Sequence, residues 1–539
     1  MPTLTIDGKP VEVPEGTNLI EAARRLGIEV PHYCYHPALS IAGQCRLCMV
    51  DVDKAPRPTI ACNTVATAGM VVHTETPRVL ETRRSVMEWH LINHPLDCPV
   101  CDQAGECWLQ IYYMEHGLYE PRMIDEKVHK PKAVPLGPYV MLDAERCILC
   151  SRCVRFCDEI TGTGELGIFN RGDHSEIGLF PGTTLDNPYS GNVVDICPVG
   201  ALTDRDFRFQ VRVWYLDRAK SICPGCARGC NIEAHTNRRR LHQSRGRRVV
   251  RLKPRFNAEV NRWWICDEGR YGFHDLDAPT RLTVPATRRA DGELQPVAWP
   301  EMVRTLADRL RAAGPERVGV LLSPKMPNED LWLARRLFVE TLGVRPVDFR
   351  VPPRAPGFED AFLIRADKTP NTRGAALIGC GAAGEADGRH VLAAAAAGRL
   401  GILWVFGHEL FAARWSETEV RAALDGVECL VFQGPNANLT SARAHLVVPS
   451  AAYVEREGTF TNFEGRVQRF WKAVEPVGEA RADWEVLADV ARALGHDWRP
   501  ARAEHLFREL AAGLPAFAGL SYRGLGDHGA LVAEPAGVR

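Results

Sequence analysis

The sequence predicts a multidomain protein of mixed α/β and α+β class, with a cysteine-rich first half and a doubly wound α/β second half. Sixteen of the eighteen cysteines lie within the first 266 of 539 residues. From about residue 273 short apolar runs alternate with helical stretches, which is typical of a mostly parallel sheet. The runs are VGVLLS, AALIG, GILWVF, CLVFQG and HLVVP. These patterns divide the chain into five predicted domains, at residues 1–80, 81–125, 126–215, 216–272 and 273–539.

Composition excludes several classes of partner. The chain has 66 basic and 67 acidic residues, so its net charge predicts no binding to nucleic acid or to an anionic membrane surface. Its longest apolar run, around LGILWVF, is about seven residues, far short of the roughly 20 that span a bilayer. The first residues carry no signal-peptide pattern, so we expect a location inside the cell. In that reducing compartment dense cysteines indicate metal binding rather than disulfides.

Residues 1–80 begin with two short alternating strands around Asp7 and Gly8, which is a hairpin signal. A helix is predicted over TNLIEAARRLG, with Thr17 as its N-cap. Four cysteines follow at spacings x10, x2 and x13, namely Cys34, Cys45, Cys48 and Cys62. The segment is similar to a plant-type [2Fe-2S] ferredoxin of β-grasp fold, although the first gap is longer than the usual x4. We therefore predict four thiolates on two irons, with zinc as the alternative.

Residues 81–125 are expected to form a helix that leads into HPLDCPVCDQAGEC. This stretch has three cysteines at metal-ligand spacing, Cys98, Cys101 and Cys107, and no fourth cysteine nearby. His94 lies four residues upstream and is predicted to complete a [4Fe-4S] site, because every other cysteine group has its own fourth ligand. The alternative is that His94 only caps or packs beside the loop.

Residues 126–215 contain the run CILCSRCVRFC, in which Cys157 is the last of four cysteines. A two-cluster ferredoxin repeats this run, and the last cysteine of each run serves the other cluster. No second run exists here, but Cys197 is followed by Pro198, as such a crossing ligand usually is. We assign one [4Fe-4S] cluster to Cys147, Cys150, Cys153 and Cys197. Cys157 is predicted to be a buried small hydrophobe.

Residues 216–272 carry a fourth group, in CPGCARGC and WWICDEGRYG. Its members are Cys223, Cys226, Cys230 and Cys266, which suit a [4Fe-4S] cluster held by two loops of a small β domain. Between them NRRRLHQSRGRRVVRLKPR contains nine basic residues. An anion or RNA site is one interpretation, but the absence of interleaved aromatic residues favours a solvated hairpin.

Two glycine motifs need separate interpretations. GTGELG, from Gly162 to Gly167, follows a cysteine run rather than a strand and is predicted to be a loop. GCGAAG, from Gly379 to Gly384, follows the predicted strand AALIG and has Glu409 after the next strand, a context that fits a dinucleotide fingerprint. EADG is a poor helix opening, however, so nucleotide binding is the less favoured interpretation. The remaining cysteines, Cys380 and Cys429, are explained by core packing.

The order of these motifs closely resembles the large iron-sulfur (G) subunit of bacterial NADH:quinone oxidoreductase, respiratory complex I. The most specific pieces are HPLDCPVCDQAGEC, RCVRFCDEITGTGELG, ICDEGRYGF and EREGTFTNFEGRVQ. In that family the last part is similar to molybdopterin oxidoreductases and has lost the metal cofactor. The part after Cys266 is shorter here than in the family, so a shortened molybdopterin-oxidoreductase-like domain is expected.

The resemblance implies an electron-transfer subunit with one [2Fe-2S] and three [4Fe-4S] clusters, no molybdopterin and no complete catalytic site of its own. It also assigns His94 the role of a cluster ligand. Electrons from NADH are expected to arrive through a flavin in a neighbouring subunit. The implied partners are that flavoprotein NADH-binding subunit, a small [2Fe-2S] subunit, and the ferredoxin-like and quinone-site subunits. The implied location is peripheral, on the cytoplasmic side of the bacterial inner membrane.

Three other classes of protein share these N-terminal motifs. A molybdopterin-dependent formate dehydrogenase usually has Lys or Arg soon after the fourth cluster cysteine, where this chain has Asp267 and Glu268. It also needs a metal ligand, for which Cys380 is the one cysteine on offer. An iron-only hydrogenase needs an adjacent cysteine pair in the second half, which is absent. A diaphorase-type subunit of another NAD-linked complex remains an alternative.

Overall fold

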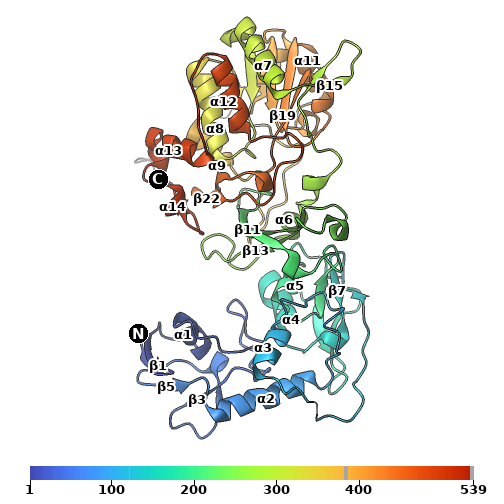
Figure 1. Ribbon diagram of the computed structural model, residues 1–539, viewed down its shortest axis with the longest axis vertical. Helices are drawn as coiled ribbons and strands as arrows, with labels where there is room; N and C mark the ends of the chain where they lie inside the picture. The colour runs from blue at the N-terminus through green and yellow to red at the C-terminus, as the bar shows by residue number, and fades with distance from the viewer. Residues whose placement is uncertain (121, 382–386, 534–539) are drawn as a thin grey trace. The chain divides into compact units, whose positions relative to one another are not determined.

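The chain folds into two compact units, Met1–Leu216 and Asp217–Arg539. The computed structural model describes residues 1–120, 122–381 and 387–533, and Figure 1 traces them from the N-terminus in blue to the C-terminus in red. In these described ranges no helix combines the length and the apolar character that crossing a membrane requires.

The first unit begins with a mixed five-stranded sheet in the order β2-β1-β5-β3-β4. β1 pairs with β2 antiparallel and with β5 parallel, where Thr5 lies opposite Val71. The elements are β1 (Thr3–Ile6), β2 (Lys9–Glu12), α1 (Leu19–Arg25), β3 (Met49–Val52), β4 (Thr59–Ile60) and β5 (Val71–His73). Apolar side chains of α1 and of the strands share one core, as the amphipathic pattern of the helix requires. This agrees with the predicted β-grasp arrangement.

The N-cap of α1 is Asn18 and not Thr17, which corrects the prediction. The Asn18 carboxamide oxygen accepts a hydrogen bond from the Glu21 backbone N–H at 3.0 Å. Thr17 lies one residue too early, and its hydroxyl donates to the Pro14 carbonyl instead. Asn and Thr are both common N-caps, so the sequence alone did not decide which of these two adjacent residues caps the helix.

The rest of the first unit is built from short elements around the remaining cysteines. They are α2 (Pro77–Leu91), α3 (Trp108–His116), β6 (Val134–Pro135), β7 (Val140–Leu142), α4 (Arg152–Phe156), β8 (Leu166–Phe169), β9 (Glu176–Leu179), α5 (Asn192–Ile196) and β10 (Leu202–Asp204). β10, β7 and β6 form a small antiparallel sheet, and β8 and β9 form a hairpin. The predicted loop over Gly162–Gly167 is present up to Glu165, after which β8 begins.

The second unit opens with an antiparallel sheet of three strands, β11 (Asp217–Ile222), β12 (Asn231–Thr236) and β13 (Val249–Pro254). β12 and β13 form the hairpin predicted for the basic stretch. The stretch is not simply solvated, however, because Arg248 at the start of β13 joins a partly buried ion-pair network. A short helix, α6 (Asp267–Tyr271), follows the last cysteine of the fourth group.

The main body of the second unit is a seven-stranded sheet in the order β15-β14-β20-β19-β18-β16-β17. β17, β16, β18, β19 and β20 are parallel, and the β14–β15 hairpin adds an antiparallel edge. The strands are β14 (Ala286–Arg288), β15 (Leu294–Pro296), β16 (Val318–Leu321), β17 (Val347–Asp348), β18 (Ile402–Phe406), β19 (Cys429–Gly434) and β20 (Leu446–Pro449).

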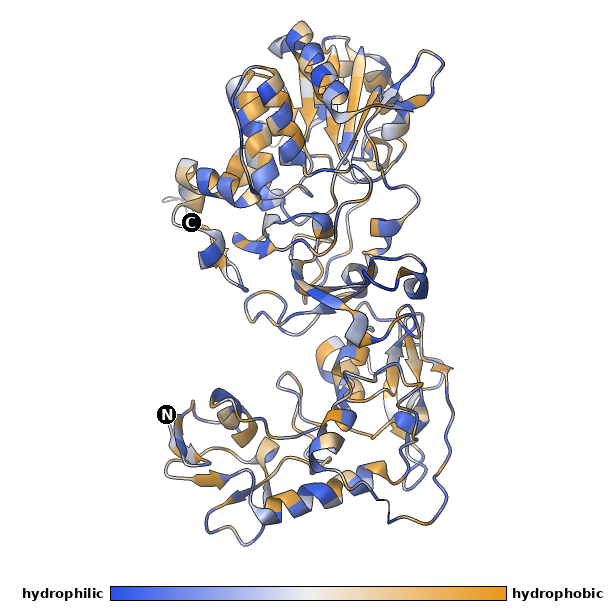
Figure 2. Cartoon of the chain, viewed as in Figure 1, coloured by the Kyte–Doolittle hydropathy of each residue, from blue (hydrophilic) through white to orange (hydrophobic). Residues whose placement is uncertain are grey.

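Helices cover both faces of this sheet. The helices are α7 (Trp299–Ala313), α8 (Asn328–Ala334), α9 (Thr372–Ile378), α10 (Arg389–Ala396), α11 (Glu417–Asp425), α12 (Asp483–Ala493), α13 (Ala503–Gly513) and α14 (Tyr522–Leu525). Along β18, Trp404 faces the core shared with α7, α8 and α12, while Leu403 and Val405 face the core shared with α10 and α11. The central strands are therefore apolar throughout, as their colour in Figure 2 shows. The doubly wound α/β prediction is confirmed.

One predicted strand is wrong, because AALIG belongs to helix α9. A separate small sheet, formed by β21 (Gly458–Thr461), β22 (Arg466–Phe470) and β23 (Ala530–Leu531), completes the unit.

Candidate metal centres

The first cysteine group forms two pairs of hydrogen-bonded thiols. Cys34 pairs with Cys45, and Cys48 pairs with Cys62, and all four side chains are buried. The shared hydrogen bond lowers the pKa of Cys34 to about 5 and raises that of Cys45. A [2Fe-2S] cluster takes four thiolates on two irons. One pair for each iron therefore fits this group.

The second group lines a small cavity between the end of α2 and the start of α3. Its walls include His94, Cys98, Cys101 and Cys107. Gly200 also lines the cavity. A side-chain carbon at this position would lie only 2.2 Å from the Cys101 sulfur, so a larger residue does not fit there. Cys98 is exposed, whereas Cys101 and Cys107 are buried.

His94 has the properties that a metal ligand needs. Its Nδ1 is buried and has no hydrogen-bond partner among the described residues. Burial, with a smaller contribution from Arg146, lowers its pKa to about 4, so the imidazole is neutral at pH 7. Neutral imidazole is the form that binds metal. A histidine that only capped the loop would instead use a ring nitrogen for a hydrogen bond.

The third group encloses an apolar cavity lined by Cys147, Cys150, Cys153 and Cys197. Leu149 between the first two of these cysteines has a left-handed backbone, with φ of 55°, and its N–H donates to the Cys147 sulfur at 3.4 Å. Tight turns of this kind let backbone N–H groups face sulfur. Such hydrogen bonds are among the factors that set the potential of an iron-sulfur cluster.

Cys157 does not line this cavity. Its side chain is fully buried in the core, in the π-helical turn Cys157–Thr161. Burial raises the pKa of its thiol, and the Glu165 carboxylate raises it further. This position agrees with a structural rather than a ligating cysteine.

The fourth group brings Cys223, Cys226, Cys230 and Cys266 together from two loops of the second unit. All four are buried, and Cys230 interacts electrostatically with the other three. The Gly269 N–H donates to the Cys266 sulfur at 3.3 Å. A side-chain carbon at Gly269 would lie 2.9 Å from the Cys223 sulfur, so glycine is required for the loops to close.

Two arginines connect the groups of the first unit, and the spacing of the cysteines alone did not reveal them. Arg155 donates to the carbonyl of Cys34 at 2.6 Å and to that of Cys150 at 3.2 Å. Arg152 donates to the carbonyls of Tyr35 and Ile196, which flank ligands of the first and third groups. A signal was present in RCVRFC, where basic residues alternate with cysteines. Their positive charge offsets the negative charge of thiolate groups nearby.

In the ranges that the structure describes, no three His, Cys, Asp or Glu side chains are close enough to share a single metal ion. An iron-sulfur cluster differs from a single ion, because its ligands are spread over several irons. Cys380 and Cys429 lie in the core of the seven-stranded sheet. The Cys380 thiol donates to the Leu331 carbonyl at 3.7 Å.

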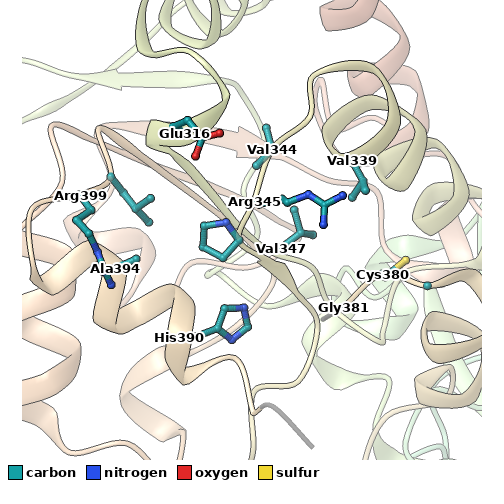
Figure 3. Close-up of a pocket in the computed structure, with 13 residues that line it drawn as sticks. Glu316, Val339, Val344, Arg345, Val347, Cys380, Gly381, His390, Ala394 and Arg399 are labelled. Carbon is teal, nitrogen blue, oxygen red and sulfur yellow. The ribbon is translucent and has the colours of Figure 1, made fainter. Parts of the chain in front are cut away.

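A cavity of about 530 Å³ lies beside β17 and α10 (Figure 3). Figure 3 shows His390, Arg399 and Arg345 on its walls, with Glu316 at one end and Cys380 at the other. Gly379 borders it as the left-handed cap of α9, with φ of 79°. The strand expected before GCGAAG is a helix, so the context of a dinucleotide fingerprint is absent. Residues 382–386 of this motif lie outside the described residues.

Comparisons with known families follow the same order along the chain. Residues 1–77 match the 2Fe-2S iron-sulfur cluster binding domain, and residues 83–122 match the NADH-ubiquinone oxidoreductase-G iron-sulfur binding region. Residues 137–203 match the ferredoxin-like domain of NADH-quinone oxidoreductase subunit 3. Residues 216–277 match the molybdopterin oxidoreductase Fe4S4 domain, and residues 371–493 match molybdopterin oxidoreductase.

Whole-chain relatives decide the family. The NADH-quinone oxidoreductase G subunit of Rickettsia bellii (strain RML369-C) is 30% identical over 628 residues, covering 96% of this chain and 90% of that protein. The chain belongs to the family of NADH-quinone oxidoreductase G subunits. The mitochondrial NADH dehydrogenase [ubiquinone] iron-sulfur protein 1 of Solanum tuberosum is 31% identical, covering 91% of this chain and 80% of that protein.

Family members differ in length. The G subunit of Streptomyces coelicolor (strain ATCC BAA-471 / A3(2) / M145) is 41% identical over 366 residues, covering 68% of this chain but only 42% of that protein. The alignment with the Rickettsia bellii protein spans more positions than the 539 residues of this chain. Relatives in the family therefore carry segments that this chain lacks.

Proposed function

We propose that this chain is an electron-transfer subunit of NADH:quinone oxidoreductase, relaying electrons from NADH towards quinone. The observation that carries the proposal is that the sixteen predicted ligands lie in four separate groups, each with four candidate ligating side chains. Family membership supports the same function, since the relatives are named as subunits of that oxidoreductase.

The proposed cofactors are one [2Fe-2S] cluster and three [4Fe-4S] clusters. Bound iron-sulfur clusters supply one-electron oxidation and reduction over a wide range of potentials. The two-iron cluster is assigned to Cys34, Cys45, Cys48 and Cys62. The four-iron clusters are assigned to His94, Cys98, Cys101 and Cys107; to Cys147, Cys150, Cys153 and Cys197; and to Cys223, Cys226, Cys230 and Cys266.

The chain's own contribution is to bind these groups and to control their surroundings. Backbone N–H groups of Leu149 and Gly269 donate to ligand sulfurs. Gly200 and Gly269 leave room next to sulfurs where a side chain would collide. Mostly apolar side chains surround the third group. Burial and hydrogen bonds to sulfur are the means by which a protein sets cluster potentials.

The second unit is proposed to hold no molybdopterin, and two contacts support this. Glu268, soon after the last ligand, forms an ion pair with Lys368 at 2.7 Å, so the nearby basic side chain is already partnered. Cys380, the one candidate metal ligand, is buried and directed to a backbone carbonyl. The formate dehydrogenase alternative needs both groups. Molybdenum or tungsten in the purified chain, or formate oxidation by it, would reinstate that alternative.

The chain is also proposed to work within a complex at the cytoplasmic face of the membrane. Its partners there are the flavoprotein NADH-binding subunit, the small [2Fe-2S] subunit, and the ferredoxin-like and quinone-site subunits. An exposed apolar face on α3 supports a partner contact, since Trp108, Ile111 and Met114 are all exposed.

Metal analysis of the anaerobically reconstituted full chain tests the function directly. Four loaded clusters correspond to about 14 irons per chain. Saturation at about 10 irons per chain would show that one of the four-iron assignments is wrong. A preparation that takes up zinc in place of iron and shows no iron-sulfur absorbance would overturn the proposal.

A further inference from the structure

Tyr453 presents a buried hydroxyl that none of the described residues satisfies. The residue begins the short 3-10 turn Tyr453–Glu455, which follows β20. Its ring packs against a small core formed by Ile222, Phe460 and Phe470. Leaving a buried hydroxyl without a partner costs about 1–3 kcal/mol. Such a group in a folded protein calls for a specific explanation, such as a bound ligand.

Cys223 of the fourth cysteine group is close enough to Tyr453 to interact with it electrostatically. Tyr453 packs against the core that contains Ile222, and Ile222 directly precedes Cys223. Burial raises the pKa of the Tyr453 phenol, and the nearby Cys223 thiolate raises it further. The phenol is therefore protonated at neutral pH, and a cluster bound by these cysteines would bring negative charge near it. A hydroxyl donor beside buried thiolates is suited to hydrogen bonding with sulfur.

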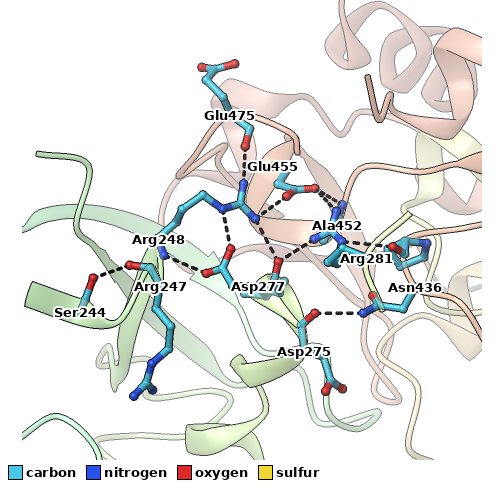
Figure 4. A network of polar contacts seen from close by, with 12 residues as sticks. Ser244, Arg247, Arg248, Asp275, Asp277, Arg281, Asn436, Ala452, Glu455 and Glu475 are labelled. Carbon is cyan, nitrogen blue, oxygen red and sulfur yellow. Dashed lines mark hydrogen bonds and ion pairs between the residues drawn. The ribbon is translucent and has the colours of Figure 1, made fainter. Parts of the chain in front are cut away.

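The turn that carries Tyr453 is held firmly against the cysteine-bearing sheet. Glu455 in the same turn accepts hydrogen bonds from Arg248 at 2.8 Å and from Arg281 at 2.7 Å (Figure 4). Arg248, at the start of β13, also pairs with Asp277 at 2.6 Å. The Val454 carbonyl accepts from the N–H of Ala473 at 2.7 Å.

The hydrogen bonds of Glu455 restrain the backbone around Tyr453. The Glu455 carboxylate is fully buried, and charge-assisted hydrogen bonds of this kind are short and strong. They fix the backbone on the C-terminal side of Tyr453, and the Ala452 N–H, which donates to Glu455 at 2.7 Å, fixes the N-terminal side. The backbone that carries the phenol is thus held on both sides.

We propose that the Tyr453 hydroxyl donates a hydrogen bond to a sulfur of the cluster bound by Cys223, Cys226, Cys230 and Cys266. The inference rests on the proposed function of these cysteines as cluster ligands. A hydrogen bond to sulfur stabilises the reduced form, which carries one more negative charge, so Tyr453 raises the reduction potential of this cluster. The cluster sulfur would also be the hydrogen-bond acceptor that the described residues do not provide for this hydroxyl.

The test uses the reconstituted full chain and the variant Tyr453→Phe. The variant removes one oxygen and keeps the ring that packs on Ile222. We expect unchanged iron content, a lower midpoint potential of this cluster in an EPR-monitored redox titration, and loss of one exchangeable-proton coupling in ENDOR spectra. An unchanged potential with the proton coupling retained would overturn the inference.

A matched control is Tyr522→Phe. Tyr522 is a second buried tyrosine of the same unit, and its hydroxyl donates to Glu329 at 2.9 Å. This variant should leave the potential of the cluster where it is in the wild type. An equal shift in both variants would assign the effect to general loosening of the unit and would contradict a specific hydrogen bond.

Two further samples keep the outcome decisive. Cys266→Ser identifies the signal of this cluster: if neither iron nor any EPR signal is lost, the ligand assignment in the proposed function is wrong. If a signal is lost but Tyr453→Phe shifts nothing, only the hydrogen-bond inference is wrong. Should Tyr453→Phe fail to load iron, 3-fluorotyrosine in place of Tyr453 supplies a stronger donor of nearly the same size. It should shift the potential upward, and no shift would contradict the inference.

Discussion

At the scale of single residues, His94 has the features expected of a ligand rather than of a structural side chain. Its Nδ1 is buried with no hydrogen-bond partner among the described residues, and three cysteines line the same cavity. An unsatisfied buried nitrogen costs free energy that a metal bond offsets. Replacing thiolate by neutral imidazole also removes one negative charge, which raises the potential of the bound cluster.

His94→Ala is expected to lose about four irons and one EPR signal, because the triplet keeps only three ligands. His94→Cys should retain the cluster at a lower potential, since a thiolate restores the negative charge. His116→Ala is the control, because this histidine ends α3 and lies outside the cavity. Four intact clusters with unchanged spectra in His94→Ala would show that His94 is not a ligand.

Cys197 and Cys157 form a second pair of residues whose roles can be separated. Cys197→Ser should abolish one [4Fe-4S] signal, because Cys197 lines the cavity of the third group. Cys157→Ser should keep all four clusters, because Cys157 lies outside that cavity and a serine hydroxyl there can still donate to the nearby Glu165 carboxylate. Iron content and EPR spectra of both variants show which cysteine is a ligand. Loss of the signal in Cys157→Ser but not in Cys197→Ser would make Cys157 the ligand.

Cysteine spacing predicted the gathering of cysteines that lie close together in one loop, such as Cys147, Cys150 and Cys153. The distant Cys197 was assigned from the proline that follows it, and His94 from the lack of a fourth cysteine. Spacing was not enough to predict the residues that complete each site. Gly200 and Gly269 matter only because a sulfur from another segment approaches them. Arg155 contacts a carbonyl 121 residues away in the chain. Contacts of this kind depend on the tertiary fold, which single-sequence patterns do not encode.

At the scale of elements, short apolar runs predicted strands correctly where branched and aromatic residues dominate them. GILWVF and CLVFQG form strands β18 and β19 as predicted, since branched and aromatic residues favour strands. AALIG was predicted as a strand and is helical, because its alanines favour a helix and periodicity cannot decide so short a run. Arg248 was expected to be solvated, yet two carboxylates from distant segments pair with it.

The cap of α1 gives a prediction at this scale. Asn18→Ala removes the acceptor for the Glu21 N–H and should lower the opening free energy of α1 by about 1 kcal/mol. Thr17→Ala is the matched control and should change it by less than about 0.5 kcal/mol, since Thr17 bonds only to an exposed carbonyl. Native-state hydrogen exchange of the α1 amides measures both. Equal effects of the two substitutions on the opening free energy would contradict the assignment of Asn18 as the N-cap.

At the scale of the whole molecule, the two units depend on their metal sites to different degrees. In the first unit Cys34, Cys45, Cys107 and Cys150 belong to a hydrophobic core together with side chains of α2 and α3. In the second unit the two cores of the seven-stranded sheet contain none of the proposed ligands. We therefore expect metal binding to be part of folding in the first unit, while the sheet has its own apolar core.

Removal of iron by a chelator under reducing conditions should therefore abolish slow hydrogen exchange across most of the first unit. The strands β16, β18 and β19 should stay protected, because burial of their side chains does not involve a cluster. Hydrogen exchange followed by mass spectrometry resolves the two units in the intact chain. Simultaneous loss of protection in both would mean that the sheet also needs metal.

The exposed apolar face of α3 is explained if the molecule binds a partner there. Trp108 is 42% exposed, Ile111 37% and Met114 65%, and residues three apart lie on one side of a helix. Leu109 and Tyr112 on the other side are buried in the first unit. An apolar stripe of this kind on the surface marks an interaction site.

Met114→Lys is predicted to weaken assembly of the chain into its complex at least tenfold, about 1.4 kcal/mol, because a charge would be buried in an apolar contact. Lys is tolerated near the C-terminal end of a helix, so folding and iron content should not change. Leu439→Lys is the control, since Leu439 is 63% exposed in the second unit and lies near Glu409, which favours a lysine. Native gels of complexes purified through a tagged partner subunit measure assembly. Normal assembly of Met114→Lys, or an equal defect in Leu439→Lys, would place the partner contact elsewhere on the chain.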